Sequence, residues 1–174
     1  LLRDNVYGTI EEDAVRRDFT INALYYSPDD FGVYDFINSL NDIQNRQIRL
    51  IGDPETRYRE DPVRMLRAIR FASKLDFDIA QETKSPIREL ASLLNNISPA
   101  RLFDEVLKLL LSGCAFDTFQ KLLSFQLFDP LFPQVSQVLR NDPRSNFYKS
   151  FIDQGLKNTD TRILAQKPVT PAFL

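Results

Sequence analysis

Apolar residues recur at helical spacing along most of the chain beyond residue 60. The stretch 99–112 is the clearest example, because its apolar side chains form a stripe along one helical face: Leu102, Val106, Leu109 and Leu110. The same spacing predicts further helices over about 62–75, 86–94, 116–128 and 145–158. Three of the helix starts place a capping side chain before a proline: Asp61-Pro62, Ser85-Pro86 and Ser98-Pro99.

The first 53 residues follow a different pattern. Thr9 and Glu12 have the spacing of a capping box, which predicts a helix from about residue 10 to the turn at 27–30. The runs 31–36 and 48–51 have the composition of short strands, joined by a polar segment over 38–46. The sequence therefore predicts a small α/β part up to about residue 53, followed by an all-helical part.

The composition of the 174-residue chain excludes several kinds of site, because it holds no His, one Cys and five scattered Gly residues. Without His there is no His-based triad or His–metal cluster. A single Cys forms no internal disulfide and no Cys-based zinc site. The Gly spacing matches neither GxGxxG nor a Walker A loop, so phosphate chemistry would rest on carboxylates, arginines and helix ends.

Net charge and hydropathy exclude a membrane-spanning segment but do not identify a binding partner. The 22 Lys and Arg residues against 24 Asp and Glu residues give a net charge of −2, so charge alone does not indicate a nucleic-acid-binding protein. The apolar runs are too short to span a membrane. With one Cys, this pattern fits a soluble protein of a reducing compartment, and we expect a cytoplasmic location.

The first candidate site is the polar cluster 16–22. If the predicted helix continues through it, Asp18 and Asn22 lie one turn apart on one face. The Asp18 carboxylate could then bind a divalent cation, and the Asn22 amide a sugar hydroxyl. Arg16 and Arg17 beside them could neutralise a triphosphate. The alternative is an ordinary solvated amphipathic helix, which the spacing alone favours.

A second cluster lies at 57–74, where six basic residues accompany two acidic ones, a local net charge of +4. Four of the basic residues fall within about a third of the circumference of the predicted helix: Arg64, Arg67, Arg70 and Lys74. Such a stripe suits RNA or a triphosphate. An exposed helix face that binds nothing is an equally good interpretation of the stripe alone.

Asp61 and Arg64 form a more specific pair, because both can converge near the start of that helix. A carboxylate accepts from an exocyclic amine while a guanidinium donates to a ring nitrogen, so the pair could read the edge of adenine or of cytosine. It would reject guanine and uracil, whose carbonyl oxygens would face the carboxylate. Without other observations, a plain N-cap with an exposed i,i+3 ion pair is favoured.

Asp76-Phe77-Asp78 has the Asp-x-Asp form that metal-dependent nucleotidyl transfer requires. It follows a helix end, with no strand and no Gly-rich turn before it. We therefore expect a loop at this position and no metal site.

Two longer stretches resemble motifs of one known family. Residues 10–24, with Arg16-Arg17-Asp18-Phe19-Thr20-Ile21-Asn22 at their centre, look like its second motif. Residues 60–72, which begin Glu60-Asp61-Pro62-Val63-Arg64, look like its nucleotide-selecting motif. Both stretches are similar to motifs of the bacterial nucleotidyltransferases, the family that includes the poly(A) polymerases and the CCA-adding enzymes. Within it, three stretches look more like the poly(A) polymerases: 3–8, 56–59 and 158–162.

The resemblance implies a fold and a division of the chain. Residues 1–53 would be an α/β remnant of the nucleotidyltransferase head. An all-α neck with nucleotide-selecting and RNA-binding helices would follow over 54–128, and the start of a helical body over 129–174.

The resemblance also implies a reaction, the template-independent addition of AMP from ATP to RNA 3′ ends, in a longer cytoplasmic enzyme with Mg²⁺ as cofactor. Asp18 matches a catalytic carboxylate and metal ligand of the family. The remaining matches are nucleotide-binding positions and RNA-binding positions: Arg17, Asn22, Asp61, Arg64 and Arg67 for the nucleotide, Arg70 and Lys74 for RNA.

The chain departs from the family pattern at one important place. The Gly-Gly turn and the strand with Asp-x-Asp that open the family's head are absent from these 174 residues. We therefore expect the chain to be a piece of an enzyme that is inert by itself. Two other functions stay open: CCA addition to tRNA, and a non-catalytic RNA-binding module.

Overall fold

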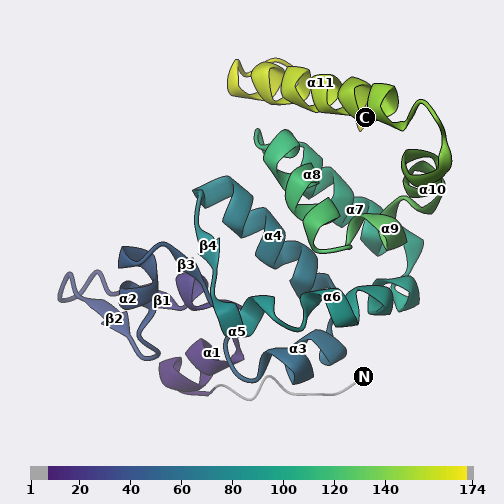
Figure 1. Ribbon diagram of the computed structural model, residues 1–174. Coiled ribbons are helices and arrows are strands. Elements are labelled where there is room, and N and C mark those ends of the chain that lie inside the picture. Colours follow the sequence, from purple (N-terminus) through teal and green to yellow (C-terminus); the bar gives the residue numbers. More distant parts are fainter. Residues whose placement is uncertain (1–7, 172–174) are drawn as a thin grey trace.

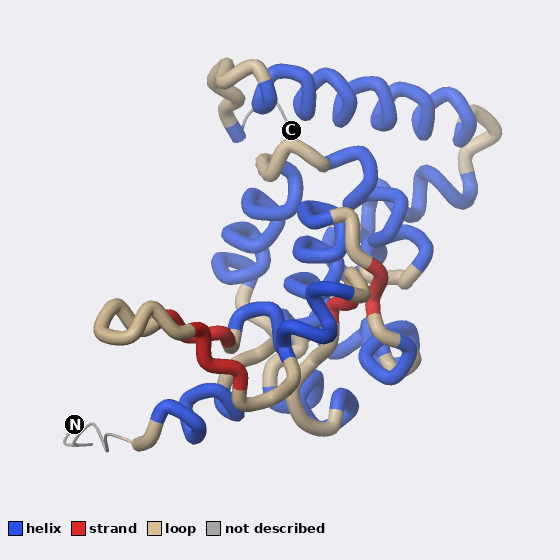
Figure 2. Tube along the Cα trace, turned by 90° about the vertical axis from the view of Figure 1, so that its left-hand side faces the viewer, coloured by secondary structure: helices blue, strands red, loops and turns tan. Residues whose placement is uncertain are grey.

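A computed structural model describes residues 8–171 of the chain. Most of them are helical, as the sequence predicts, and the helices follow one another into a stack with a short hairpin projecting from its side (Figure 1). Figures 1 and 2 both place the C-terminal helix across one end of the stack and the N-terminal helix toward the other end. The stretch 3–8 is one of the three that look more like the poly(A) polymerases, and its residues 3–7 lie outside the described residues.

The first helix, α1 (Ile10–Arg16), begins with the predicted capping box. The backbone N–H of Glu12 donates to Thr9 Oγ1 at 3.2 Å, and that of Thr9 donates to Glu12 Oε2 at 3.0 Å. The predicted continuation of this helix to residue 27 is wrong, because the backbone turns extended at Arg17. The cause lies at Phe19, which is fully buried and forms an isolated antiparallel bridge with Leu50.

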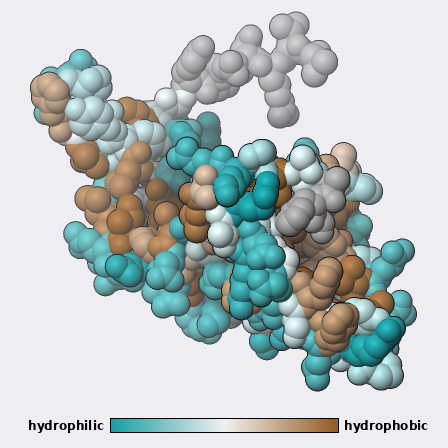
Figure 3. Space-filling view, turned by 90° about the horizontal axis from the view of Figure 1, so that it is seen from above, coloured by the Kyte–Doolittle hydropathy of each residue, from teal (hydrophilic) through white to brown (hydrophobic). Residues whose placement is uncertain are grey.

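A short 3₁₀ turn, η1 (Thr20–Asn22), and the strand β1 (Leu24–Tyr26) replace the rest of that helix. β1 pairs antiparallel with β2 (Val33–Asp35), which lies inside the predicted strand 31–36. The hairpin carries exposed apolar side chains, including Phe31 at 78% exposure. Figure 3 shows apolar groups at the surface on this side of the molecule.

The predicted polar connection 38–46 contains a helix, α2 (Ser39–Gln44). Its start is held by the Asp35 carboxylate, which accepts from three backbone N–H groups: Ile37 at 3.2 Å, Ser39 at 2.8 Å and Leu40 at 2.8 Å. The sequence pattern missed this helix because its capping carboxylate lies at the end of the preceding strand.

A second pair of strands links the two halves of the chain. β3 (Gln47–Ile48) runs parallel to β4 (Asp78–Ile79). The predicted strand at 48–51 is therefore shorter and begins one residue earlier. The expected loop at 76–78 is correct for Asp76, whose φ of 54° ends a helix, but wrong for Asp78, which pairs with Gln47.

Two helices, α3 (Pro54–Glu60) and α4 (Val63–Leu75), carry the basic cluster. α3 is a separate helix that the sequence pattern did not resolve, and Asp53 caps it by accepting from the Thr56 backbone N–H at 2.9 Å. Asp61 accepts from the Val63 backbone N–H at 3.2 Å, so its side chain caps the start of α4 as predicted.

The predicted helix 86–94 is broken into two pieces, α6 (Ile87–Leu90) and the 3₁₀ helix η2 (Ala91–Asn96). A short helix that was not predicted, α5 (Gln81–Lys84), precedes them. Ser98 occupies the predicted N-cap position of the helix that begins at Pro99, but its side chain makes no capping hydrogen bond. The predicted cap at Ser85 is wrong, because the N-cap of α6 is Pro86. The Ser85 hydroxyl instead donates backwards to the Glu82 carbonyl at 3.3 Å. The backbone of Ser85 is helical, so α5 runs almost directly into α6.

The C-terminal helices are α7 (Pro99–Leu110), α8 (Ala115–Ser124), α9 (Phe128–Leu131), α10 (Pro133–Asn141) and α11 (Ser145–Leu164). α8 ends before the predicted residue 128, with Gln126 at a φ of 60°. α10 was not predicted, and α11 continues beyond the predicted residue 158. Asp160 of α11 caps α8, because its carboxylate accepts from the backbone N–H groups of Ala115 at 2.6 Å and Phe116 at 3.0 Å.

The main core is an apolar cluster that extends from Phe19 to Leu156, and a smaller cluster of Ala14, Ala23 and Ile51 lies apart from it. α4 packs against α7 and α8, and α11 packs against α8 and α10. The main cluster crosses both predicted domain boundaries, at 53/54 and 128/129, so the division into head, neck and body stays a prediction about the longer protein. Across residues 8–171, no helix combines the length and apolarity that a membrane crossing requires.

Candidate nucleotide-binding site

Asp18 lies in the turn between α1 and η1, with its side chain only 15% exposed. Its Oδ1 accepts from the Phe19 backbone N–H at 2.9 Å and from Asn22 Nδ2 at 3.1 Å. The structure therefore brings Asp18 and Asn22 together as predicted, although the helix that was expected to align them is absent. The tight turn at Phe19 does this instead.

Arg67 of α4 completes this group. Its Nε donates to Asp18 Oδ2 at 2.5 Å, and its Nη2 pairs with the same oxygen. The Arg67 guanidinium also lies 5.3 Å from the centre of the Phe71 ring, which meets the Phe19 ring edge-on at 5.5 Å. The turn after α1 and the helix α4 thus meet through one ion pair and one aromatic contact.

The Arg70 guanidinium also lies near Phe71, 5.1 Å from the ring centre. Partial burial, and then the charge of Arg67, lower the pKa of Arg70 below its ordinary value, although the group stays charged at neutral pH. Lys74, one turn further on, is exposed. Neither Arg70 nor Lys74 has an ion-pair partner among residues 8–171.

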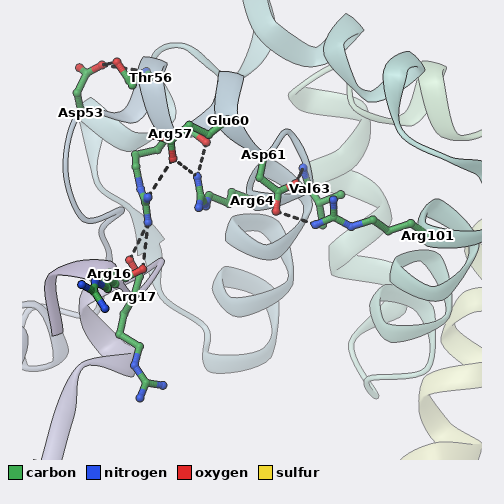
Figure 4. Close-up of polar contacts among 10 residues, drawn as sticks. All are labelled: Arg16, Arg17, Asp53, Thr56, Arg57, Glu60, Asp61, Val63, Arg64 and Arg101. Carbon is green, nitrogen blue, oxygen red and sulfur yellow. Dashed lines mark hydrogen bonds and ion pairs between the residues drawn. The ribbon is translucent and has the colours of Figure 1, made fainter. Parts of the chain in front are cut away.

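Arg64 is held from one side by α3. Its Nη1 donates to the backbone carbonyl of Arg57 at 2.7 Å and to Glu60 Oε2 at 2.9 Å (Figure 4). The hydrogen bond from Arg64, followed by the charges of Arg57 and Arg64, lowers the pKa of Glu60. With one nitrogen held in this way, the other donors of the Arg64 guanidinium are left for a ligand.

The Arg64 backbone N–H donates to the Asp61 carbonyl at 3.1 Å, but the two side chains do not pair, so the i,i+3 ion pair weighed against a base-reading role is absent here. Asp61 Oδ2 instead accepts from Arg101 Nη2 of α7 at 2.7 Å, while its Oδ1 caps α4 (Figure 4). The Asp61 side chain is 26% exposed, so solvent reaches this carboxylate.

The Arg17 side chain does not join this group. It pairs with Asp13 one helical turn back, at 2.7 Å from Nη2 to Oδ2, and its guanidinium lies 5.8 Å from the centre of the Tyr25 ring. What Arg17 contributes toward α3 is its backbone carbonyl, which accepts from Arg57 at 3.0 Å.

The expected metal ligation by Asp18 does not fit this arrangement. Both carboxylate oxygens are already engaged, by Asn22 and the Phe19 N–H on one side and by Arg67 on the other. Residues 8–171 contain no group of three or more His, Cys, Asp or Glu side chains placed to hold a metal ion. We therefore derive no step through a metal bound to this chain.

Sequence reasoning missed three residues of the site. Arg57 and Glu60 entered only the charge count and the stretches 56–59 and 60–72 that carry the resemblance, and neither was given a role in the site. Arg101 gave no signal at all, because its contact with Asp61 spans 40 residues and depends on how α7 packs.

Two family descriptions match the chain. One, "Poly A polymerase head domain", matches residues 2–49. The other, "Probable RNA and SrmB- binding site of polymerase A", matches residues 76–139. The chain belongs to the poly(A) polymerase family of nucleotidyltransferases. The first description covers the Asp18 turn, and the second covers α7 with Arg101.

Individual relatives also support this assignment to the family. Poly(A) polymerase I of Salmonella typhi is 58% identical over 100% of this chain, which spans 37% of that relative's length. A CCA-adding enzyme of Lactobacillus helveticus is 38% identical over 79% of this chain and 35% of its own length. The crystal structure of a Bacillus stearothermophilus CCA-adding enzyme in complex with CTP matches with a TM-score of 0.65, at 38% identity, over 70% of this chain and 30% of that one.

Proposed function

We propose that the longer protein containing this chain adds AMP from ATP to RNA 3′ ends without a template. The full-length match to poly(A) polymerase I supports this reaction more than CCA addition, because the CCA-adding relative is less similar and covers less of the chain. The observation that carries the proposal is the Asp18–Arg67 pair, because it places both family motifs in one site.

In this site Asp61 and Arg64 select the base. The Asp61 carboxylate accepts from the exocyclic amine of adenine, and Arg64 donates to the adjacent ring nitrogen. Arg101 already donates a hydrogen bond to Asp61 Oδ2. The adenine amine therefore either shares this oxygen with Arg101 or displaces the Arg101 guanidinium from it.

Asp18, Asn22 and Arg67 act beside the sugar and phosphates. Asp18 is the family's catalytic position, and its geometry supports a role in orienting the Arg67 guanidinium toward the triphosphate. Asn22 is placed by the same carboxylate and offers its amide to the ribose. Arg17 stays a predicted nucleotide-binding residue that would have to leave Asp13 to reach a phosphate.

Arg70 and Lys74 continue the cationic face of α4 and offer charges to the RNA backbone. The proposed reaction uses a divalent metal, which we take to be Mg²⁺, and we assign it no ligand among residues 8–171. A cytoplasmic location, where ATP and RNA are both present, stays a prediction.

The test offers ATP and CTP separately to the full-length protein, with a tRNA lacking its 3′ end and with an unstructured RNA as primers. Long A tails on the unstructured RNA are expected. CCA addition confined to the tRNA would instead support the second function, for which the Asp61–Arg64 pair is equally suited. Salt-sensitive RNA binding without affinity for either nucleotide would support a non-catalytic RNA-binding module.

A further inference from the structure

The Arg57 side chain connects two segments of the site that lie 40 residues apart in sequence. Its Nη2 donates to the backbone carbonyls of Arg17 at 3.0 Å and of Arg16 at 3.3 Å. These carbonyls lie at the end of α1, where the last helical carbonyls lack partners within the helix. A guanidinium there satisfies them, and its charge opposes the negative end of the helix.

The same guanidinium is tied to the nucleotide-selecting motif on its other side. Its Nη1 donates to Glu60 Oε2 at 3.0 Å, and the same oxygen accepts from Arg64 Nη1 at 2.9 Å. The side chains of Arg57 and Arg64 are 19% and 17% exposed, whereas that of Glu60 is 49% exposed, so water screens these ion pairs in part. Figure 4 shows Arg57 between the Arg16 and Arg17 carbonyls on one side and Glu60 with Arg64 on the other.

We propose that Arg57 is a positioning residue that fixes the base-selecting Arg64 relative to the Arg17–Asp18 turn. Asp18 directly follows the carbonyl that Arg57 holds, and Arg64 shares the carboxylate that Arg57 binds. The residues that bind the base and those that bind the phosphates are then held at a fixed distance from each other. The inference rests on the proposed function, whose nucleotide this link would position.

The geometry requires a guanidinium in particular. Only a planar fork can direct one nitrogen at two carbonyls and another at a carboxylate, whereas Lys offers a single nitrogen. Without Arg57, Glu60 would pair with Arg64 alone and could move with it. The selection of the base would weaken although Arg64 itself is intact.

The experiment compares Arg57→Lys, Arg57→Gln and Arg57→Ala in the full-length protein. The matched control is Arg59→Lys, on the same helix, because Arg59 is 57% exposed and pairs only with Glu55 among the described residues. Calorimetry measures the Kd for ATP and for GTP, whose carbonyl oxygen would face the Asp61 carboxylate. Incorporation assays measure kcat and KM, and thermal unfolding confirms that each variant is folded.

Arg57→Lys is expected to reduce the ATP-over-GTP preference and kcat/KM for ATP by about tenfold to a hundredfold, since small misplacements in a site have effects of this size. Arg59→Lys should match the wild type. Millimolar guanidinium should partly restore the ATP preference of Arg57→Ala, and an equal concentration of ammonium should not.

A folded Arg57→Lys variant with wild-type preference and kinetics would overturn the inference. So would an equal loss in Arg57→Lys and Arg59→Lys. If the wild type binds ATP but incorporates no AMP, the proposed function fails, and the ratio of the Kd values for ATP and GTP in the Arg57 variants still decides the role of Arg57.

Discussion

Arg67 donates from Nε to Asp18 Oδ2 at 2.5 Å across 49 residues of sequence. The Asp18 side chain is 15% exposed and that of Arg67 is 30% exposed, so water only partly screens the pair. This contact joins the turn after α1 to the helix that carries the base-selecting residues. The proposed nucleotide site therefore depends on a tertiary contact as well as on the two motifs.

Replacing Asp18 by Asn tests this contact directly. The amide keeps the size of the side chain but removes the charge that orients Arg67, so AMP incorporation by the full-length protein should fall by about a hundredfold or more. Because the pair is partly exposed, the loss of stability should be about 1 kcal/mol, which shifts Tm by about 2–4 °C. Incorporation rates and thermal unfolding check both values.

Asp104→Asn is the control for this variant, because Asp104 is exposed and accepts no hydrogen bond within the described part of the chain. It should leave the incorporation rate unchanged. Near-normal AMP incorporation by Asp18→Asn would remove Asp18 from the site.

The contact between Arg101 and Asp61 predicts an effect on base selection. Arg101→Ala leaves Asp61 Oδ2 without its partner, so the carboxylate loses one constraint on its orientation. The ratio of ATP to GTP incorporation should fall by several-fold while RNA binding changes little, as competition between the two nucleotides would measure. Arg140→Ala, which removes a similarly exposed arginine from its pair with Asp129, should have no effect on the ratio.

Arg70 and Lys74 should bind RNA through its phosphates. The double variant Arg70→Ala, Lys74→Ala should reduce the slope of log Kd against log salt concentration by about 1.4–1.8, or 0.7–0.9 per lost contact. The KM for ATP should stay within about twofold, because neither residue pairs with Asp18. An unchanged slope in a salt titration would identify this part of α4 as an ordinary solvated face.

Asp35 should make stability depend on acid pH. Burial alone would raise its pKa, but the backbone N–H groups of Leu40, Ser39 and Ile37 outweigh burial and lower it. A carboxyl group whose pKa is lower in the folded state stabilises the protein above its unfolded pKa, and this contribution is lost as the pH falls through the folded value. The pH range in which the Asp35 contribution to stability is lost therefore lies below about pH 4.

Asp35→Asn should flatten the decline of unfolding free energy between about pH 4 and pH 2, and lower stability at pH 7 by about 1 kcal/mol. Urea unfolding at a series of pH values measures both. If the variant and the wild type lose stability in parallel below pH 4, the Asp35 carboxylate has no such role.

Local signals predicted the parts of the fold that local chemistry controls. The capping box at Thr9, the apolar stripe of α7 and the start of α11 all appear where the sequence places them. The end of α1 does not, because burial of Phe19 and its pairing with Leu50 override helix periodicity.

In the candidate site too, tertiary contacts decide what the local sequence pattern does not. The pairing of Asp18 with Asn22 was predicted for the wrong local reason, since a tight turn and not a helix brings them together. Arg101 could not be predicted, because its approach to Asp61 is set by the packing of α7 against α4.

The central claim is that Asp61 and Arg64 read an adenine base in a site that Asp18 and Arg67 complete. A crystal structure of the full-length protein with a non-hydrolysable ATP analogue and a short RNA tests it most directly. We expect Asp61 within hydrogen-bonding distance of the adenine N6 amine and Arg64 of N1, with Arg67 beside the phosphates. An adenine bound away from α4, or held without Asp61 and Arg64, would contradict the account.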